Sequence, residues 1–308
     1  MNRRNFINNT TAATTALMLA SLDGFASPQR NNNLHANFQL KILATSWGFD
    51  GTTDAYCAKA KKEGYDGIET WWPMKKEDQD EMFAALKKYN LEVGFLTAGS
   101  ESNFDQHFIS FKNMINAATT NKIQKPLYIN CHSGRDYFKY EQGKAFVDYT
   151  TRLSKSTGIK ILHETHRSRL MYAAPIARNY LETIPALRFT LDISHWCNVH
   201  ETLLADQQET IDLVLPRVDH IHARIGHPEG PQVNDPRAPE WEKAVTAHFA
   251  WWDKVIEIKK KQGETMTILT EFGPPDYMPT IPYTRQPVAD QWAINVHMMH
   301  TLRKRYQS

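Results

Sequence analysis

The chain has 308 residues, with 36 Lys and Arg against 34 Asp and Glu, and a formal net charge of +2. This balance argues against a nucleic-acid-binding protein, which usually carries a clustered basic excess. With 41% hydrophobic and 23% charged residues, the composition is that of a globular protein rather than a disordered one. No run of about 18 or more apolar residues is present, so we expect no membrane-spanning helix.

The first 26 residues have the features of an export signal. Arg3 and Arg4 precede a mildly apolar stretch over residues 11–22, and small residues at Gly24 and Ala26 offer a cleavage site. The paired arginines are similar to those of a twin-arginine signal. We therefore expect residues 1–26 to be removed, residues 27–38 to form a flexible leader, and the protein to be periplasmic or secreted. A disordered tail is the alternative for this segment.

Apolar runs and amphipathic stretches alternate from residue 40 onward, and each pair is typical of a strand followed by a helix. In chain order, the predicted strands cover residues 40–46, 64–69, 91–96, 127–131, 159–164, 187–192, 218–222 and 266–271. The predicted helices cover about residues 55–63, 75–89, 104–118, 140–156, 171–183, 209–215, 241–262 and 288–305.

Eight such units close into a barrel, so we predict an α/β fold in which residues 39–308 form a single (β/α)8 TIM barrel. The competing fold is a doubly wound open sheet. That fold would place a glycine-rich phosphate turn after the first strand, and this sequence has none there.

Two connections are longer than the others and rich in proline. Residues 227–240 follow the seventh predicted strand, and residues 272–287 follow the eighth. Both begin at the carboxyl end of a strand, the face on which TIM-barrel enzymes place their active sites. We therefore expect both to be active-site loops.

The last four predicted strands each end in a residue that can bind a metal. These residues are Glu164, Asp192, His222 and Glu271. In a barrel the four strand ends are neighbours, so three carboxylates would repel one another unless a cation lay between them. Oxygen ligands with one imidazole suit a single divalent ion such as Mn²⁺, Mg²⁺, Co²⁺ or Zn²⁺.

Taken singly, each of these four residues has a simpler explanation. A carboxylate after a strand often caps the next helix or pairs with its first turn, and a histidine in a buried strand often only completes a hydrogen-bond network. Their occurrence at four successive strand ends favours the metal site instead.

These residues also stand within longer motifs. The motifs are residues 64–69 (GYDGIE), Glu164, residues 191–195 (LDISH), residues 220–222 (HIH) and residues 270–273 (TEFG). Through them the sequence resembles the sugar phosphate isomerase/epimerase family, whose members have a xylose isomerase-like TIM barrel. The resemblance covers nearly all of the expected mature chain. It implies that Glu164, Asp192, His222 and Glu271 bind one metal, and that the two glutamates also act as acid and base.

The chemistry of such a site fits a carbohydrate isomerase or epimerase. A C–H bond beside a carbonyl is weakly acidic, and a metal that binds the carbonyl stabilises the enediolate formed when the proton leaves. One carboxylate removes the proton, and a second on the other face can return it with inverted stereochemistry.

Further residues near the strand ends are candidates for substrate binding: His195, Arg224, His132, His166, Glu69 and Trp47. The family counterpart of His195 contacts substrate oxygens, and Arg224 could neutralise an enediolate oxygen. Trp47, like Trp71, follows a strand, and an aromatic face at a barrel mouth can stack on a sugar ring. For each of the polar residues, a structural hydrogen bond or a loop cap is the alternative role.

Other functions remain open. The family's metal-binding epimerases carry a further glutamate six residues beyond the first ligand, where this sequence has Leu170. A metal-dependent lyase or dehydratase acting on a keto-sugar or keto-glycoside is therefore the main alternative. A nuclease of the endonuclease IV type and a non-catalytic sugar-binding barrel are the others. We expect a small carbohydrate as the partner, no nucleic acid, and an enzyme that could form a homo-oligomer.

Overall fold

Residues 37–307 are described in the computed structural model. The predicted export signal and residues 27–36 of the predicted leader lie outside the described residues, and residues 37 and 38 lead directly into the first strand. Within the described part of the chain, no helix is both long and apolar enough to cross a membrane.

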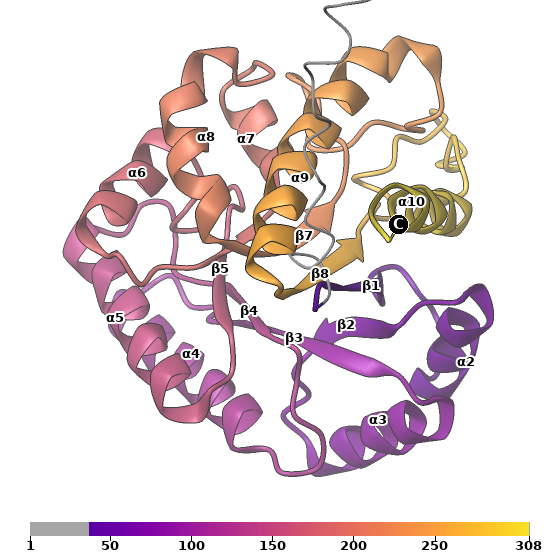
Figure 1. Ribbon diagram of the computed structural model, residues 1–308. Helices are drawn as coiled ribbons and strands as arrows, with labels where there is room; N and C mark the ends of the chain where they lie inside the picture. The colour runs from indigo at the N-terminus through magenta and orange to yellow at the C-terminus, as the bar shows by residue number, and fades with distance from the viewer. Residues whose placement is uncertain (1–36, 308) are drawn as a thin grey trace, which may run out of the picture. The chain divides into compact units, whose positions relative to one another are not determined.

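Eight parallel strands form a closed barrel at the centre of the fold (Figure 1), which confirms the predicted TIM barrel. Each strand pairs with the next along the chain, and the first pairs with the last. The strands are β1 (Gln39–Thr45), β2 (Gly67–Trp71), β3 (Glu92–Ala98), β4 (Ile129–His132), β5 (Ile161–Glu164), β6 (Phe189–Leu191), β7 (Val218–Ala223) and β8 (Thr265–Thr270).

Helices surround the barrel and cover its outer face (Figure 1). They are α2 (Thr53–Glu63), α3 (Lys76–Tyr89), α4 (Phe104–Thr120), α5 (Tyr140–Thr157), α6 (Ala174–Thr183), α7 (Ile193–Val199), α8 (Gln208–Val214), α9 (Glu242–Gln262) and α10 (Gln291–Tyr306). Short 3-10 turns at Ala205–Gln207, Leu215–Arg217 and Pro239–Trp241 lie before α8, before β7 and before α9. Helix α10 contacts both β1 and β8, so it covers the seam where the barrel closes.

The sequence pattern missed one helix. It placed the sixth helix at residues 209–215, where α8 lies, but the structure adds α7 immediately after β6. The first five residues of α7, from Ile193 to Cys197, are all buried. A helix that is buried on every side lacks the alternation of polar and apolar faces by which an amphipathic helix is detected.

Four buried side chains fill part of the barrel interior and form a cluster separate from the main core: Leu43, Tyr128, Leu162 and Leu269. Successive side chains of a strand point to opposite faces, so the residue two positions further on points the same way. Those residues are Thr45, Asn130, Glu164 and Glu271. An apolar plug therefore supports a polar layer toward the carboxyl ends of the strands.

A buried ion network holds the start of β7. Asp219 accepts hydrogen bonds from Arg188 Nε at 2.7 Å and from Lys259 Nζ at 2.6 Å, and Lys259 is only 1% exposed. Burial acts to raise the pKa of Asp219, but the hydrogen bond from Arg188 and the charges around it outweigh burial and lower that pKa.

We predict that Asp219→Ala lowers the free energy of unfolding by about 3 kcal/mol, because it leaves the buried Lys259 ammonium with less compensation. The loss should be complete above about pH 4, the pKa of unfolded Asp, and should shrink as the pH falls toward the lower folded pKa. Urea unfolding at several pH values measures both effects. The exposed pair Lys76–Asp80 is the control, and Asp80→Ala should change stability by less than about 0.5 kcal/mol.

Candidate functional site

A cavity of about 290 Å³ opens at the carboxyl ends of the strands. Seven of the ten residues predicted as site residues line it: Trp47, Glu69, His132, Glu164, His166, Arg224 and Glu271. The other three are Asp192, His195 and His222. They have no exposed surface but contact the lining residues. The structure therefore gathers all ten predicted residues around one cavity.

The four predicted metal ligands converge. Nδ1 of His222 lies 2.9 Å from Glu271 Oε2 and 3.7 Å from Glu164 Oε1. Asp192, His222 and Glu271 each place one possible ligand atom within 4.8 Å of those of the other two. Ligand atoms of Glu164, Asp192 and His195 meet the same distance limit. The barrel thus brings the side chains at the four strand ends close together, and their binding of one ion stays a prediction.

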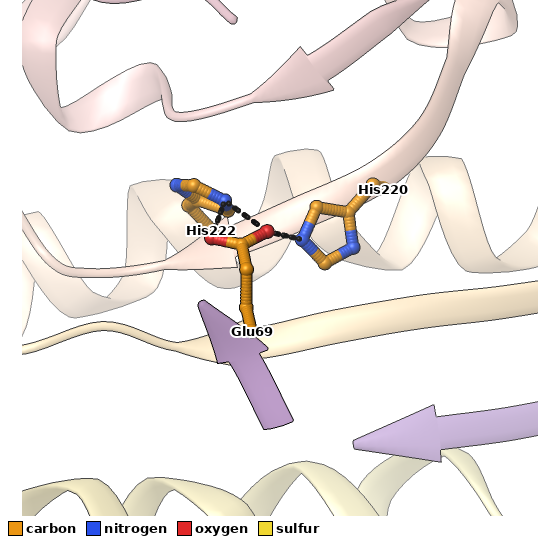
Figure 2. A group of neighbouring side chains, drawn as sticks. All are labelled: Glu69, His220 and His222. Atoms are coloured by element: carbon orange, nitrogen blue, oxygen red, sulfur yellow. Dashed lines mark hydrogen bonds and ion pairs between the residues drawn. The ribbon is translucent and has the colours of Figure 1, made fainter. Parts of the chain in front are cut away.

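Glu69 holds His222 from the opposite side (Figure 2). Its carboxylate comes from β2 and lies 3.3 Å from Nε2 of His222 and 3.5 Å from Nε2 of His220, both on β7. Tyr128 also donates its hydroxyl to Glu69 at 2.8 Å. A carboxylate only accepts hydrogen bonds, so Glu69 favours a proton on Nε2 of His222. Glu164 and Glu271 face Nδ1 and favour a proton there in the same way.

The electrostatics of the cluster favour a cation. Burial opposes a charge on His222, yet Glu271, Glu69 and Glu164 outweigh it and raise the pKa of that imidazole well above its ordinary value. Burial also acts to raise the pKa of Glu69, but His222 and His220 lower it to about 2. The buried carboxylates thus stabilise positive charge placed between them.

Glu164 is held in one orientation by its neighbours. Its Oε2 accepts a hydrogen bond from Asn130 Nδ2 at 2.6 Å and lies 2.8 Å from His132 Nε2. Its other oxygen, Oε1, is the one that faces His222. Burial acts to raise the pKa of Glu164, but the charges of His132 and His222 outweigh it and keep that pKa well below its usual value, so the group is ionised.

Arg224 is the fixed cation of the cluster. Its guanidinium is 2% exposed, donates to Asp192, and lies 2.9 Å from His195 Nε2 and 3.6 Å from Glu271 Oε2. Because arginine only donates, Nε2 of His195 accepts, and the proton of that neutral ring is on Nδ1. Burial raises the pKa of Asp192 to about 7, with Arg224 opposing the rise and Glu271 and Glu164 adding to it.

Three imidazoles form a row along one side of the cavity. The ring centroids of His132 and His166 are 4.8 Å apart, and those of His166 and His195 are 3.9 Å apart. Burial, with a smaller contribution from the nearby His132, lowers the pKa of His166 to about 3. The row therefore joins Glu164 at one end to Arg224 and Asp192 at the other with at least one neutral ring between them.

Sequence reasoning missed two residues of the site. Asn130 holds Glu164, and its signal was its place two residues before His132, on the same face of β4. Tyr277 lines the cavity from the connection between β8 and α10, where the guanidinium of Arg224 lies 4.8 Å from its ring centroid. The length and proline content of residues 272–287 predicted an active-site loop here, but a loop has no periodic pattern that would single out Tyr277 within it.

The residues present fit a divalent cation. Nδ1 of His222 and Oε2 of Glu271 are both buried and make no well-formed hydrogen bond, although they face each other. Three carboxylates with one imidazole form a donor set that such ions accept. One guanidinium, already bonded to Asp192, is the only Lys or Arg side chain among the described residues that line the cavity.

The sequence matches the family of xylose isomerase-like TIM barrels over residues 57–269, and the chain belongs to this family. No curated protein matches the sequence significantly. Among solved structures, D-allulose 3-epimerase from Methylomonas sp. is 15% identical, with a TM-score of 0.60 over 87% of this chain and 98% of that one.

Two further structures share the fold. The 3-keto-D-glucoside 4-epimerase from E. coli is 14% identical, with a TM-score of 0.57 over 86% of this chain and 100% of that one. A probable 3-DHS dehydratase from Bacillus anthracis is 16% identical, with a TM-score of 0.54 over 86% of this chain and 98% of that one. At these identities the likeness extends to the fold alone.

Proposed function

We propose that this protein is a metal-dependent isomerase or epimerase that removes a proton next to the carbonyl of a carbohydrate. The observation that carries the proposal is the convergence of Glu164, Asp192, His222 and Glu271, from four successive strand ends, on one cavity. Two similar structures are epimerases of carbohydrates by name, which supports this choice of reaction.

Glu164, Asp192, His222 and Glu271 would hold one divalent ion: Mn²⁺, Mg²⁺, Co²⁺ or Zn²⁺. When bound, such an ion supplies Lewis-acid polarisation of the carbonyl. Glu69 would position His222 for this role, because its contact with Nε2 would keep a proton there while Nδ1 gives up its own proton to bind the ion.

The two glutamates would move the proton. Glu164 is ionised and held by Asn130 and His132, so it can take the proton from carbon as the electron pair of the C–H bond shifts toward the carbonyl. Glu271 enters the cavity from β8 rather than β5, so it can return a proton from another side. Arg224, between the two, can neutralise the developing charge on oxygen.

We also propose that residues 1–26 direct export to the periplasm or the medium by a twin-arginine-type route. Sugar phosphates are cytoplasmic metabolites, so an exported enzyme meets unphosphorylated carbohydrates. The scarcity of basic side chains in the cavity lining is consistent with an uncharged substrate.

A lyase or dehydratase is the second candidate. It would begin with the same proton removal and end with loss of the substituent on the next carbon. The row of His132, His166 and His195 favours this reaction, because it offers groups that could assist a leaving hydroxyl or glycosyl oxygen in addition to the two glutamates. One similar structure is a probable dehydratase by name.

We expect the purified protein to bind about one divalent ion per chain, and to exchange the proton beside the carbonyl of a keto-sugar with solvent. Metal analysis and turnover of a keto-sugar panel in D₂O measure this. Deuterium without loss of a substituent identifies the isomerase or epimerase, and loss of the substituent identifies the lyase. A chain that binds metal and sugar but exchanges no proton is a non-catalytic barrel.

We predict that Glu164→Gln and Glu271→Gln each reduce turnover by about 10²–10⁴-fold or more, because each removes a proton-transfer group. Circular dichroism and thermal unfolding should show an intact fold. The exposed Glu240→Gln is the matched control and should keep wild-type turnover. Near-wild-type rates in either site variant would exclude the proposed mechanism.

We predict that Glu69→Gln weakens metal affinity by about 10–100-fold, because an amide does not enforce the Nε2 proton on His222 as a carboxylate does. A calorimetric titration of the metal-free protein with Mn²⁺ measures the dissociation constant of the ion independently of enzyme activity. Glu240→Gln should again match the wild type, and an unchanged constant in Glu69→Gln would remove Glu69 from the ligand support.

A further inference from the structure

The outer wall of the cavity is aromatic, and the proton-transfer chemistry uses none of it. Trp47 and Trp71 both line the cavity, and 37% and 46% of their surfaces are exposed. Large exposed indoles at the mouth of a cavity mark a surface that binds something. The question is which part of a substrate these rings meet.

Trp47 is a fixed inner wall. Its backbone oxygen accepts a hydrogen bond from Gln291 Nε2 at 2.8 Å, and the ring of Tyr277 meets it edge-on at 4.8 Å. The ring lies so close to Gly273 that a Cβ there would collide with it. The ring centroid of Trp47 lies 5.9 Å from the guanidinium of Arg224, so this indole lies beside the charged residues of the cavity.

Trp71 lies further out. It is two residues beyond Glu69 on β2, and both line the cavity. Two residues along a strand span about 6.6 Å, so the indole stands roughly one sugar ring outward from the layer of Glu69. Trp72, the first residue after β2, is 4% exposed and packs edge-on against Phe95 in the core.

The neighbours of Trp71 leave much of its surface open. Its indole meets the ring of His132 edge to face, with the ring centroids 5.4 Å apart and an angle of 88° between the ring planes. The open surface adjoins the same cavity into which Glu164 and Glu271 project. An apolar surface that continues a polar site suits a ligand with one reacting ring and a second ring attached.

The charge of the lining selects among ligands. Within the described residues that line the cavity, Arg224 is the sole Lys or Arg, and it donates to Asp192. A phosphate in the cavity would therefore meet one guanidinium that already binds a carboxylate, and no lysine of the lining. The C–H face of an uncharged sugar ring stacks well on an indole, while its hydroxyls remain in water.

We propose that Trp71 forms a second subsite and that the substrate is a glycoside: a reacting sugar over the carboxylates, joined to a second sugar ring that stacks on Trp71. This rests on the proposed function, in that the reacting sugar occupies the site described above. Trp47 bounds the inner ring and Trp71 the outer one. A free monosaccharide would leave the outer subsite empty.

The test compares ligands of one and two rings. Calorimetry with the Mn²⁺-loaded full chain should show that cellobiose or maltose binds about ten-fold more tightly than glucose, since the second ring buries apolar surface and gains an aromatic contact. Trp71→Ala should remove this advantage and change glucose binding less than two-fold. Trp71→Phe should retain most of it, because the aromatic face remains.

Tyr283→Ala is the matched control, since Tyr283 is a fully exposed aromatic residue that does not line the cavity. It should bind all three sugars as the wild type does. The subsite is overturned if Trp71→Ala weakens glucose and the disaccharides equally, if neither disaccharide binds more tightly than glucose, or if glucose 6-phosphate binds more tightly than both.

Failure of the subsite and failure of the proposed function give different results. A loss of disaccharide binding in Trp71→Ala, together with wild-type turnover in Glu164→Gln, would keep the subsite and reject the mechanism. Solvent exchange into monosaccharides that depends on Glu164, with no effect of Trp71→Ala on any ligand, would keep the mechanism and reject the subsite.

Discussion

The structure of the barrel mouth depends on an excess of buried negative charge. Glu69, Glu164, Asp192 and Glu271 share a small volume with one guanidinium, that of Arg224, and carboxylates removed from water are costly unless cations or donors compensate them. Neighbouring side chains supply this compensation: Tyr128, Asn130 and the imidazoles all direct polar atoms at the carboxylate oxygens. A site that stabilises added positive charge follows from this arrangement.

The sequence was sufficient for the barrel and for the position of the cavity. Strand periodicity defines the alternating units, and in the structure Gly64, Gly158 and Gly263 end helices in left-handed conformations. The four ligand candidates were found because parallel strands of a barrel end on the same face. Helix α7 was missed because its first five residues are all buried, which erases the polar–apolar pattern on which the prediction depends.

What the sequence could not provide was the direction of each side chain. Glu69 was expected to bind a substrate hydroxyl, and its carboxylate lies instead against His220, His222 and Tyr128, although it still borders the cavity. Its proposed substrate contact stays a prediction. Arg224 was expected to face substrate, and in the structure it also binds Asp192 and His195. Such contacts join residues far apart in the chain, which no local pattern reports.

The contact between Glu69 and His222 (Figure 2) joins residues 153 positions apart, on β2 and β7, which do not pair with each other in the barrel. His222 therefore acquires its orientation only once β2 and β7 occupy their final places. A cation that requires this orientation binds the closed barrel and not a partly assembled one, and by mass action it stabilises the closed state as a whole. If the site binds the proposed ion, loading of the site and completion of folding are linked equilibria.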